Sequence, residues 1–370
     1  MAESLGRLTT YRIQAWDNSG SGFGPGALIA TFANAKNLGW AEYLNDVPEA
    51  FFTLNQDDPQ LLRLRTYRDK THIRIFRDSD LVWAGMMSEW DANERDAIIY
   101  ATGYLSYFYK LASDWDVAYT TVQINTIVSD YITYAKTTLT NSPAAWLTTG
   151  TIQAPVTTSG GATPISLPTY KLFWKRGLFL LHEMAALAIG NTTNQPVFEV
   201  TPTGTFNFWK NLGQDRTTRW EYGDGRVAGF AESAVPILKR TEVLAAGNNP
   251  NDTLLRSDID DATLRAAIGR SQEPMFFSWV RDSTELDKVA QYRASMLKRD
   301  VSDLMLQFHP GSLIPARATG AGFVLGDRVN VKIDRGITSI DSKYMVRGQQ
   351  VYVIRERERV NILVDERSGT

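Results

Sequence analysis

Alternation of apolar and polar residues predicts strands in the first hundred residues. The segment 11–16 (YRIQAW) alternates with the period of a half-buried strand. The polar stretch 77–80 lies between two β-prone runs and indicates a hairpin. Short strands at this spacing favour a small barrel or sandwich, so we expect a first β-domain over residues 1–105. The further β-prone runs are 28–32, 50–54, 71–76, 81–86 and 96–102.

The spacing of apolar residues changes to that of a helix after this domain. Behind a possible capping box at Thr120 and Gln123, apolar side chains recur every three or four residues up to Ala135. A second helix is expected over about 175–189, where one face is again apolar. The two helices predict a helical insertion domain over residues 106–196.

Strand patterns return in the second half of the chain. The glycine-rich turn 223–225 is flanked by β-prone runs and indicates another hairpin. We expect a second β-domain over residues 197–245 and 313–370. It is interrupted by an α/β insertion domain over 246–312, whose centre is a helix from about 283 to 300. The predicted fold class is β-rich α+β, with two small β-barrel domains and two insertion domains.

Composition narrows the classes of protein that fit this pattern. Hydrophobic residues make up 43% and charged residues 22% of the 370 positions, as in folded proteins. The net charge of −2 disfavours tight binding to nucleic acid. The absence of cysteine excludes disulfides, thiolate zinc sites and cysteine nucleophiles. No signal peptide or long apolar stretch is evident, so we expect cytoplasmic synthesis and no membrane insertion.

The three histidines give little support for catalysis or metal binding. His72, His182 and His309 fall in a predicted strand, a predicted helix and a turn, without metal-ligand spacing. The chain has no GxSxG motif that would place a serine nucleophile beside a histidine. We therefore predict no catalytic, cofactor-binding or metal-binding residues, no cofactor, and no enzymatic activity.

Other candidate features have simpler structural interpretations. The adjacent acids Asp57-Asp58 and Asp260-Asp261 could act as paired carboxylates but fit turns and caps better. The segment 320–326 resembles a phosphate loop only superficially, because a strand follows it instead of a helix. The charged run 355–359 is interpreted as a solvated turn. An aromatic group favours core packing or a subunit interface over sugar stacking; it comprises Tyr100, Tyr104, Tyr107, Phe108, Tyr109 and Trp115.

The order and spacing of several segments together carry a resemblance; these segments are 50–54 with Asp57-Asp58-Pro59, 73–78, 82–85, 221–225, 284–297 and 322–329. They resemble the tail hub proteins of siphophages. The resemblance covers nearly the whole chain, and each motif alone is weak. The family includes tail-associated minor tail proteins and is similar to baseplate hubs of contractile phages and to type VI secretion spikes.

The resemblance implies a structural role at the virion tail tip after synthesis in the host bacterial cytoplasm. It implies a homotrimer whose six β-barrel hub domains form a ring that adapts a sixfold tail tube to a threefold tip. A distal tail protein or tail tube protein would lie above this ring and a tip fibre or spike protein below it. The tape measure protein would occupy the lumen, and DNA would pass in transit. The alternative interpretation is a carbohydrate-binding or glycan-degrading protein of a tail tip.

Overall fold

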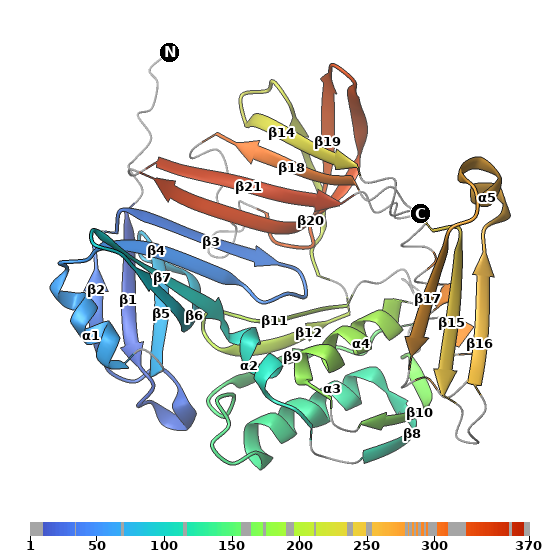
Figure 1. The fold of residues 1–370 in the computed structure, drawn as a ribbon, viewed down its shortest axis with the longest axis horizontal. Helices are drawn as coiled ribbons and strands as arrows, with labels where there is room; N and C mark the ends of the chain where they lie inside the picture. The colour runs from blue at the N-terminus through green and yellow to red at the C-terminus, as the bar shows by residue number, and fades with distance from the viewer. Residues whose placement is uncertain are drawn as a thin grey trace.

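The computed structural model describes most of the chain and is dominated by one large sheet. The sheet has 13 strands, which come from the N-terminal and the C-terminal parts of the chain (Figure 1). Three smaller sheets, of two or three strands, accompany it. The described residues are 10–33, 35–67, 70–113, 117–156, 164–172, 175–189, 196–210, 212–234, 240–248, 254–277, 280, 283–284, 286–287, 290–291, 294, 302–309, 323–354 and 357–365.

The first part of the large sheet, here called the first β-unit, comes from the first hundred residues. Alternate residues of β7 are fully buried, because successive side chains of a strand point to opposite faces. Helix α1 (Pro59–Tyr67) packs on β2 through Leu61 and Leu64. The strands are β1 (Tyr11–Asp17), β2 (Leu28–Phe32), β3 (Asn37–Tyr43), β4 (Glu49–Asn55), β5 (Thr71–Arg77), β6 (Asp80–Ala92) and β7 (Asp96–Gly103).

The second part, the second β-unit, is assembled from strands that lie far apart in the sequence. It uses Val329, Val331 and Ile333, which alternate as predicted and are all buried. Its strands are β13 (Asp215–Glu221), β14 (Val227–Ala234), β18 (Ser302–Phe308), β19 (Arg328–Arg335), β20 (Thr338–Ile354) and β21 (Arg357–Asp365).

The two β-units repeat one strand order. Neighbouring strands of the first unit follow β1-β5-β6-β7-β4-β3, and those of the second follow β13-β19-β20-β21-β18-β14. Numbered within each unit by chain position, leaving out the additional strand β2, both orders are 1-4-5-6-3-2. All these pairs are antiparallel except β13 with β19, which is parallel. The repeat lies in the topology and not in any visible repetition of the sequence.

A mainly helical layer lies under this sheet in the view of Figure 1 and has its own core. Helix α3 begins at Ile124 and packs its apolar face against α4, as the spacing predicts. Thr120 and Gln123 belong to a strand, and Gln123 makes no side-chain cap, so the predicted capping box is wrong. The elements are η3 (Tyr104–Ser106), α2 (Tyr107–Lys110), β8 (Val117–Gln123), α3 (Ile124–Thr133), η4 (Tyr134–Thr138), β9 (Thr148–Ile152), β10 (Ser166–Leu172), α4 (Gly177–Ile189), β11 (Val197–Val200) and β12 (Thr205–Trp209).

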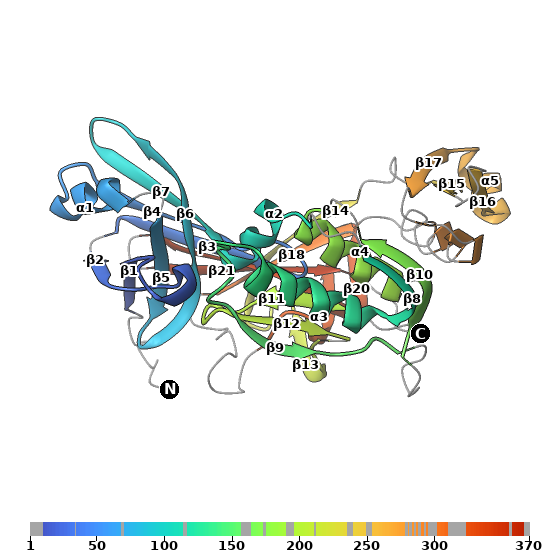
Figure 2. The ribbon, with the colours of Figure 1, turned by 90° about the horizontal axis from the view of Figure 1, so that it is seen from below.

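An inserted unit interrupts the second β-unit between β14 and β18. It stands apart from the large sheet in both views (Figures 1 and 2). One face of its three-stranded sheet packs on Leu286 and Ala290 of the predicted helix, which is helical at each described position from 283 to 294. Its elements are β15 (Glu242–Asn248), β16 (Leu254–Asp260), α5 (Ala262–Ile268) and β17 (Gln272–Phe277).

The structure corrects three expectations about strand pairing. No sheet of the described residues closes into a barrel, because the two β-units join edge to edge in one open sheet. The glycine-rich turn 223–225 does not form the predicted hairpin, since β13 pairs with β19 and β14 with β18. Strands β11 and β12, expected in the second β-domain, pair with β9, and β15 pairs with β16 and β17. Local turn signals could not reveal these distant partners.

Candidate functional site

The two β-units meet where strand β20 changes its neighbour. Residues Thr338–Met345 of this 17-residue strand pair with β19, whereas Gly348–Ile354 pair with β3 of the first β-unit. The pairing with β21 shifts register between Val346 and Gly348, as at a β-bulge. A bulge bends a strand and increases its twist, which allows β20 to leave one neighbour and join another. We call the contacts around the β20–β3 pairing the junction.

The side chains at the junction fit closely. A Cβ atom added to Gly348 would lie 2.4 Å from Cδ1 of Tyr43, so only glycine leaves room for this ring. Gln350 Nε2 donates a hydrogen bond to the Tyr43 hydroxyl at 2.5 Å. Gln349 Nε2 donates to Glu42 Oε2 at 2.5 Å, and both of these side chains are buried. The buried side chains of Glu42 and Gln349 therefore satisfy each other, as buried polar groups require.

Apolar side chains of both β-units form one continuous core at the junction. Trp40 of β3 and Val351 of β20 are opposite each other in the pairing, and both are buried. The ring of Tyr11 lies 5.8 Å from the ring of Trp40. One cluster of buried side chains extends from the first β-unit through these residues into the second. Because separation would expose this core, we expect the two β-units to move together.

A buried ion pair also links the two β-units. Arg77 Nη2 at the end of β5 donates to Glu358 Oε2 of β21 at 2.9 Å, and the side chains are 14% and 6% exposed. Burial, and then the charge of Glu358, raise the pKa of Tyr11 well above its usual value. The interpretation of 355–359 as a solvated turn is therefore wrong for Glu358. Residues 355 and 356 lie outside the described residues.

Strands β2 and β13 each pair with one strand only, and two further edges of the large sheet are open among the described residues, at the end of β6 and along β14. The end of β6, from Glu89 to Ala92, pairs with β7 on one side and with no described strand on the other. Figure 2 shows this end projecting with β7 from the body. Strand β14 likewise pairs only with β18 along its length. Unpaired backbone groups of an edge strand are ready to pair with another strand, so these edges are candidate assembly surfaces.

The histidines have structural surroundings. His72 is fully buried, its Nδ1 lies 3.2 Å from the Tyr104 hydroxyl, and its Nε2 lies 3.1 Å from the carbonyl oxygen of Phe23. Burial lowers the pKa of His72 to about 4. Burial also lowers the pKa of His182, whose ring packs edge-on against Phe198. Within the described ranges, no three acidic or histidine side chains gather as metal ligands.

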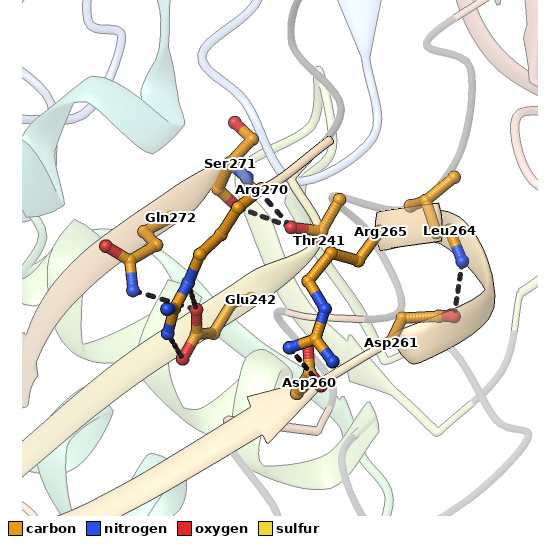
Figure 3. Close-up of polar contacts among 9 residues, drawn as sticks. All are labelled: Thr241, Glu242, Asp260, Asp261, Leu264, Arg265, Arg270, Ser271 and Gln272. Carbon is orange, nitrogen blue, oxygen red and sulfur yellow. Dashed lines mark hydrogen bonds and ion pairs between the residues drawn. The ribbon is translucent and has the colours of Figure 1, made fainter. Parts of the chain in front are cut away.

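Asp58 and Asp261 of the two adjacent acid pairs serve as turn and cap residues, as expected, whereas Asp260 ends β16 and makes an ion pair. Asp58 Oδ1 accepts a hydrogen bond from the backbone N–H of Gln60 at 2.8 Å before α1. Asp261 caps α5 by accepting from the backbone N–H of Leu264 at 2.9 Å, and Asp260 pairs with Arg265 at 2.8 Å (Figure 3). These carboxylates are occupied locally and do not face one another across a cleft.

A third acid of the inserted unit, Glu242, is held still more closely. It accepts two hydrogen bonds from Arg270, at 2.9 and 3.1 Å, and one from Gln272 (Figure 3). These donors, Arg270 first, lower the pKa of Glu242. These contacts join the start of β15 to the start of β17, so Glu242 has a structural role.

The remaining sequence candidates have structural positions or lie outside the described residues. Tyr104, Tyr107 and Phe108 are buried in the core of the helical layer, which confirms the core interpretation for them. Tyr109 is 49% exposed. Trp115 and residues 320–322 lie outside the described residues. At the end of the glycine-rich segment, buried Asp327 accepts from the backbone N–H groups of Gln214 and Val324 and from Arg216.

A cavity of about 420 Å³ lies beside the junction. The buried pair Glu42 and Gln349 forms part of its wall, and β11 contributes Glu199, whose carboxylate accepts a hydrogen bond from Asn207 at 3.2 Å. Sequence reasoning missed both the cavity and the junction. Their residues come from positions about 300 apart, and no local pattern connects them.

Comparison with solved structures identifies the class of protein that has this fold. A tail protein from Neisseria meningitidis MC58 matches with a TM-score of 0.63 and 12% identity, over 96% of this chain and 97% of that chain. The 43 kDa tail protein of prophage MuSo2 from Shewanella oneidensis matches with a TM-score of 0.63 and 11% identity, over 96% and 98%. The prophage tail protein gp18 from Listeria monocytogenes matches with a TM-score of 0.54 and 8% identity, over 96% and 95%.

This chain therefore has the fold of phage and prophage tail proteins. The resemblance drawn from the sequence is confirmed at the level of the fold. No family model matches the sequence, and no curated protein matches it. Among the helices that the structure describes, none is long and apolar enough to cross a membrane.

Proposed function

We propose that the chain is a structural hub protein of a phage tail tip. The observation that carries the proposal is the repeated strand order, 1-4-5-6-3-2, in two β-units that a shared core holds together. The likeness to phage and prophage tail proteins over nearly the whole chain supports the same role.

A rigid pair of similar units is suited to a change of symmetry. Three copies around an axis would present six β-units of one topology, which could meet a sixfold tail tube on one side. The remaining parts of each chain differ from one another, so the other side would keep threefold symmetry. Closed rotational symmetry builds such rings from one repeated interface. The homotrimer would thus adapt the tube to the tip and leave a channel on its axis.

The partners follow from that position. A distal tail protein or tail tube protein would lie above the ring, and a tip fibre or spike protein below it. The tape measure protein would occupy the lumen before DNA passes. The net charge of −2 suits a channel for DNA, because each phosphate contacted by Lys or Arg would add affinity and delay transit. We place the protein in the virion tail tip after synthesis in the host cytoplasm.

Within this proposal the chain has no enzymatic role. Of the acids considered as catalytic pairs, Asp58 and Asp261 accept backbone hydrogen bonds at a turn or helix start, and Asp260 pairs with an arginine. His72 is buried and hydrogen-bonded. Three of the aromatic side chains that motivated carbohydrate binding are core residues. These three aromatic residues therefore give no support to the alternative of a glycan-binding or glycan-degrading protein.

The mass of the protein in solution and a reconstruction of the tail tip test the proposal. We expect a trimer by light scattering and, in the tail, a ring of three chains whose six β-units surround the axis. A ring of six identical chains, or a chain located away from the tail axis, would contradict the proposed function. Purified protein that cleaves host glycan, and loses this activity when one acid is substituted, would contradict the non-enzymatic role.

A further inference from the structure

We propose that the open end of β6 pairs with β14 of a second copy of this chain, in the register that β20 and β3 use within one chain. The inference rests on the proposed function and deepens it by naming the strands that join neighbouring copies. Its basis is the repeated strand order, since β6 and β20 hold the same place in their units, as do β14 and β3.

The two bulges align β6 with β20. In β6 the pairing with β7 shifts between Met87 and Glu89, and in β20 the pairing with β21 shifts between Val346 and Gly348. Both strands are long, and in both the first half pairs with the preceding strand of the unit. Counting from the bulge, Asp91 of β6 corresponds to Gln350 of β20.

The neighbouring strands align β14 with β3 in the same way. In the first unit, Met87 of β6 is opposite Ala101 of β7, Ala101 is opposite Ala50 of β4, and Ala50 is opposite Trp40 of β3. In the second unit, Val346 of β20 is opposite Val364 of β21, Val364 is opposite Leu304 of β18, and Leu304 is opposite Glu232 of β14. Trp40 of β3 therefore corresponds to Glu232 of β14. The next residue of each strand also corresponds, so that Ala41 matches Ser233.

These correspondences specify the contact between copies. Within the chain, Gln350 is opposite Ala41 in the antiparallel junction. Asp91 of one copy would therefore be opposite Ser233 of the next, and Ala92 opposite Glu232. Glu89, Asp91 and Ala92 are exposed on β6, and Ala231 and Glu232 are exposed on β14, so both strands are accessible at these positions. Both edges lack a described partner strand, as pairing with a second copy requires.

The contact uses different surfaces of the two copies, so it is a head-to-tail contact. A head-to-tail contact builds a ring if its rotation closes, and an open filament otherwise. Junctions within chains would then alternate with contacts of the same topology between chains. The contact between chains is the shorter one, because β6 ends at Ala92, whereas β20 continues to Ile354 beyond the equivalent position. The ring would therefore separate between copies before it separates within a chain.

Cysteine crosslinking tests this register directly, because the chain has no cysteine of its own. Residues directly opposite in a sheet bring their Cβ atoms close enough for a disulfide. One preparation carries Asp91→Cys and another Ser233→Cys. After mixing and mild oxidation, a covalent dimer is expected on a non-reducing gel. Neither variant alone should give this dimer, and a chain with both substitutions should give covalent trimers.

Two matched pairs control the experiment. Gln350→Cys with Ala41→Cys in one chain reports the equivalent pair inside the junction and should form an intramolecular disulfide. Asp91→Cys mixed with Ala228→Cys, at the far end of β14, should give no dimer. Trimers or rings that form without the Asp91–Ser233 crosslink would overturn the pairing and leave the proposed function standing. A chain that stays monomeric and is absent from tail tips would overturn both.

Discussion

The two β-units show how little of a strand order depends on particular side chains. Phe52 of the first unit and Leu306 of the second hold equivalent places, as do Ala101 and Val364, and all four side chains are buried. The equivalent residues differ in size and type. What they share is an apolar side chain that points to the inner face of the sheet, at the equivalent position of the equivalent strand. The topology is therefore encoded by the period and the pairing and can recur without a visible sequence repeat.

The differences between the units lie at their margins. In the first, a short turn joins β3 to β4, and β2 with α1 extends one side. In the second, the whole inserted unit occupies the equivalent connection between β14 and β18. Connecting segments at the surface generally tolerate insertions, so the inserted unit leaves the pairing of the core strands unchanged. Each of the following predictions asks where the likeness of the two units ends.

Truncation of equivalent core residues gives the largest expected effect. Phe52→Ala and Leu306→Ala each remove a fully buried side chain, and each should lower the free energy of unfolding by about 3 kcal/mol or more. Because the units share one core, each variant should weaken both units together. Calorimetry should show one transition at a lower temperature, and hydrogen exchange should rise in peptides of both units.

An exposed substitution in each unit provides the control. Thr31→Ala in β2 and Ser339→Ala in β20 change exposed positions away from the open edges of β6 and β14, and should leave the transition within about 0.5 kcal/mol of the original protein. Loss of protection confined to the unit that carries the truncation would contradict the shared core. In that case the junction would be a hinge between two independent units.

Removal of one member of the buried ion pair tests the polar link between the units. Glu358→Leu leaves the guanidinium of Arg77 buried without its partner, which should cost about 3–5 kcal/mol. The double variant Arg77→Leu with Glu358→Leu removes both charges and should recover much of this loss. Urea unfolding of the single and double variants measures the difference. Equal stabilities for Glu358→Leu and the double variant would show that the pair is not coupled.

The sequence predicted the parts whose information is local. The strands of the first β-unit other than β3, and the helices near 124–133 and 177–189, were predicted from the pattern of their apolar residues, whereas β3 (Asn37–Tyr43), which forms the junction, was not predicted. The turn 223–225 suggested a hairpin, yet β13 and β14 belong at opposite ends of their unit. The junction was also missed. Glu358 looks like one charge in a solvated run, and only the fold brings Arg77 to it from 281 positions away.

Acid should distinguish the two β-units through His72. Its pKa falls from 6.5 to about 4 because the folded protein buries it, whereas the unfolded chain exposes it. The unfolded state therefore binds more protons between these values, and stability should fall by about 3 kcal/mol as the pH decreases through this window. The equivalent position of the second unit is occupied by Arg328, so that unit has no buried histidine at this place.

Thermal melts of the original protein and of His72→Gln between pH 7 and pH 4 measure this contribution. The variant should be less stable at pH 7, because it loses the ring contacts with Tyr104. Its stability should nevertheless depend less steeply on pH between pH 6.5 and about 4, because the variant lacks the one proton that unfolding takes up at His72 in this range. An unchanged slope would assign the acid sensitivity to other groups.

The smallest effect concerns the bulges, where the two units differ by one side chain. Gly348 follows the bulge of β20 under the ring of Tyr43, whereas its equivalent Glu89 is exposed on the open edge of β6. Gly348→Ala places a Cβ where the ring lies and should cost about 1–3 kcal/mol. Glu89→Ala meets no such neighbour. Addition of Tyr43→Ser should relieve the clash, so that a double-mutant cycle of urea midpoints shows positive coupling. If Gly348→Ala costs no more than Glu89→Ala, the close fit of Tyr43 does not constrain the junction. The rigidity of the two units would then depend on their shared apolar core.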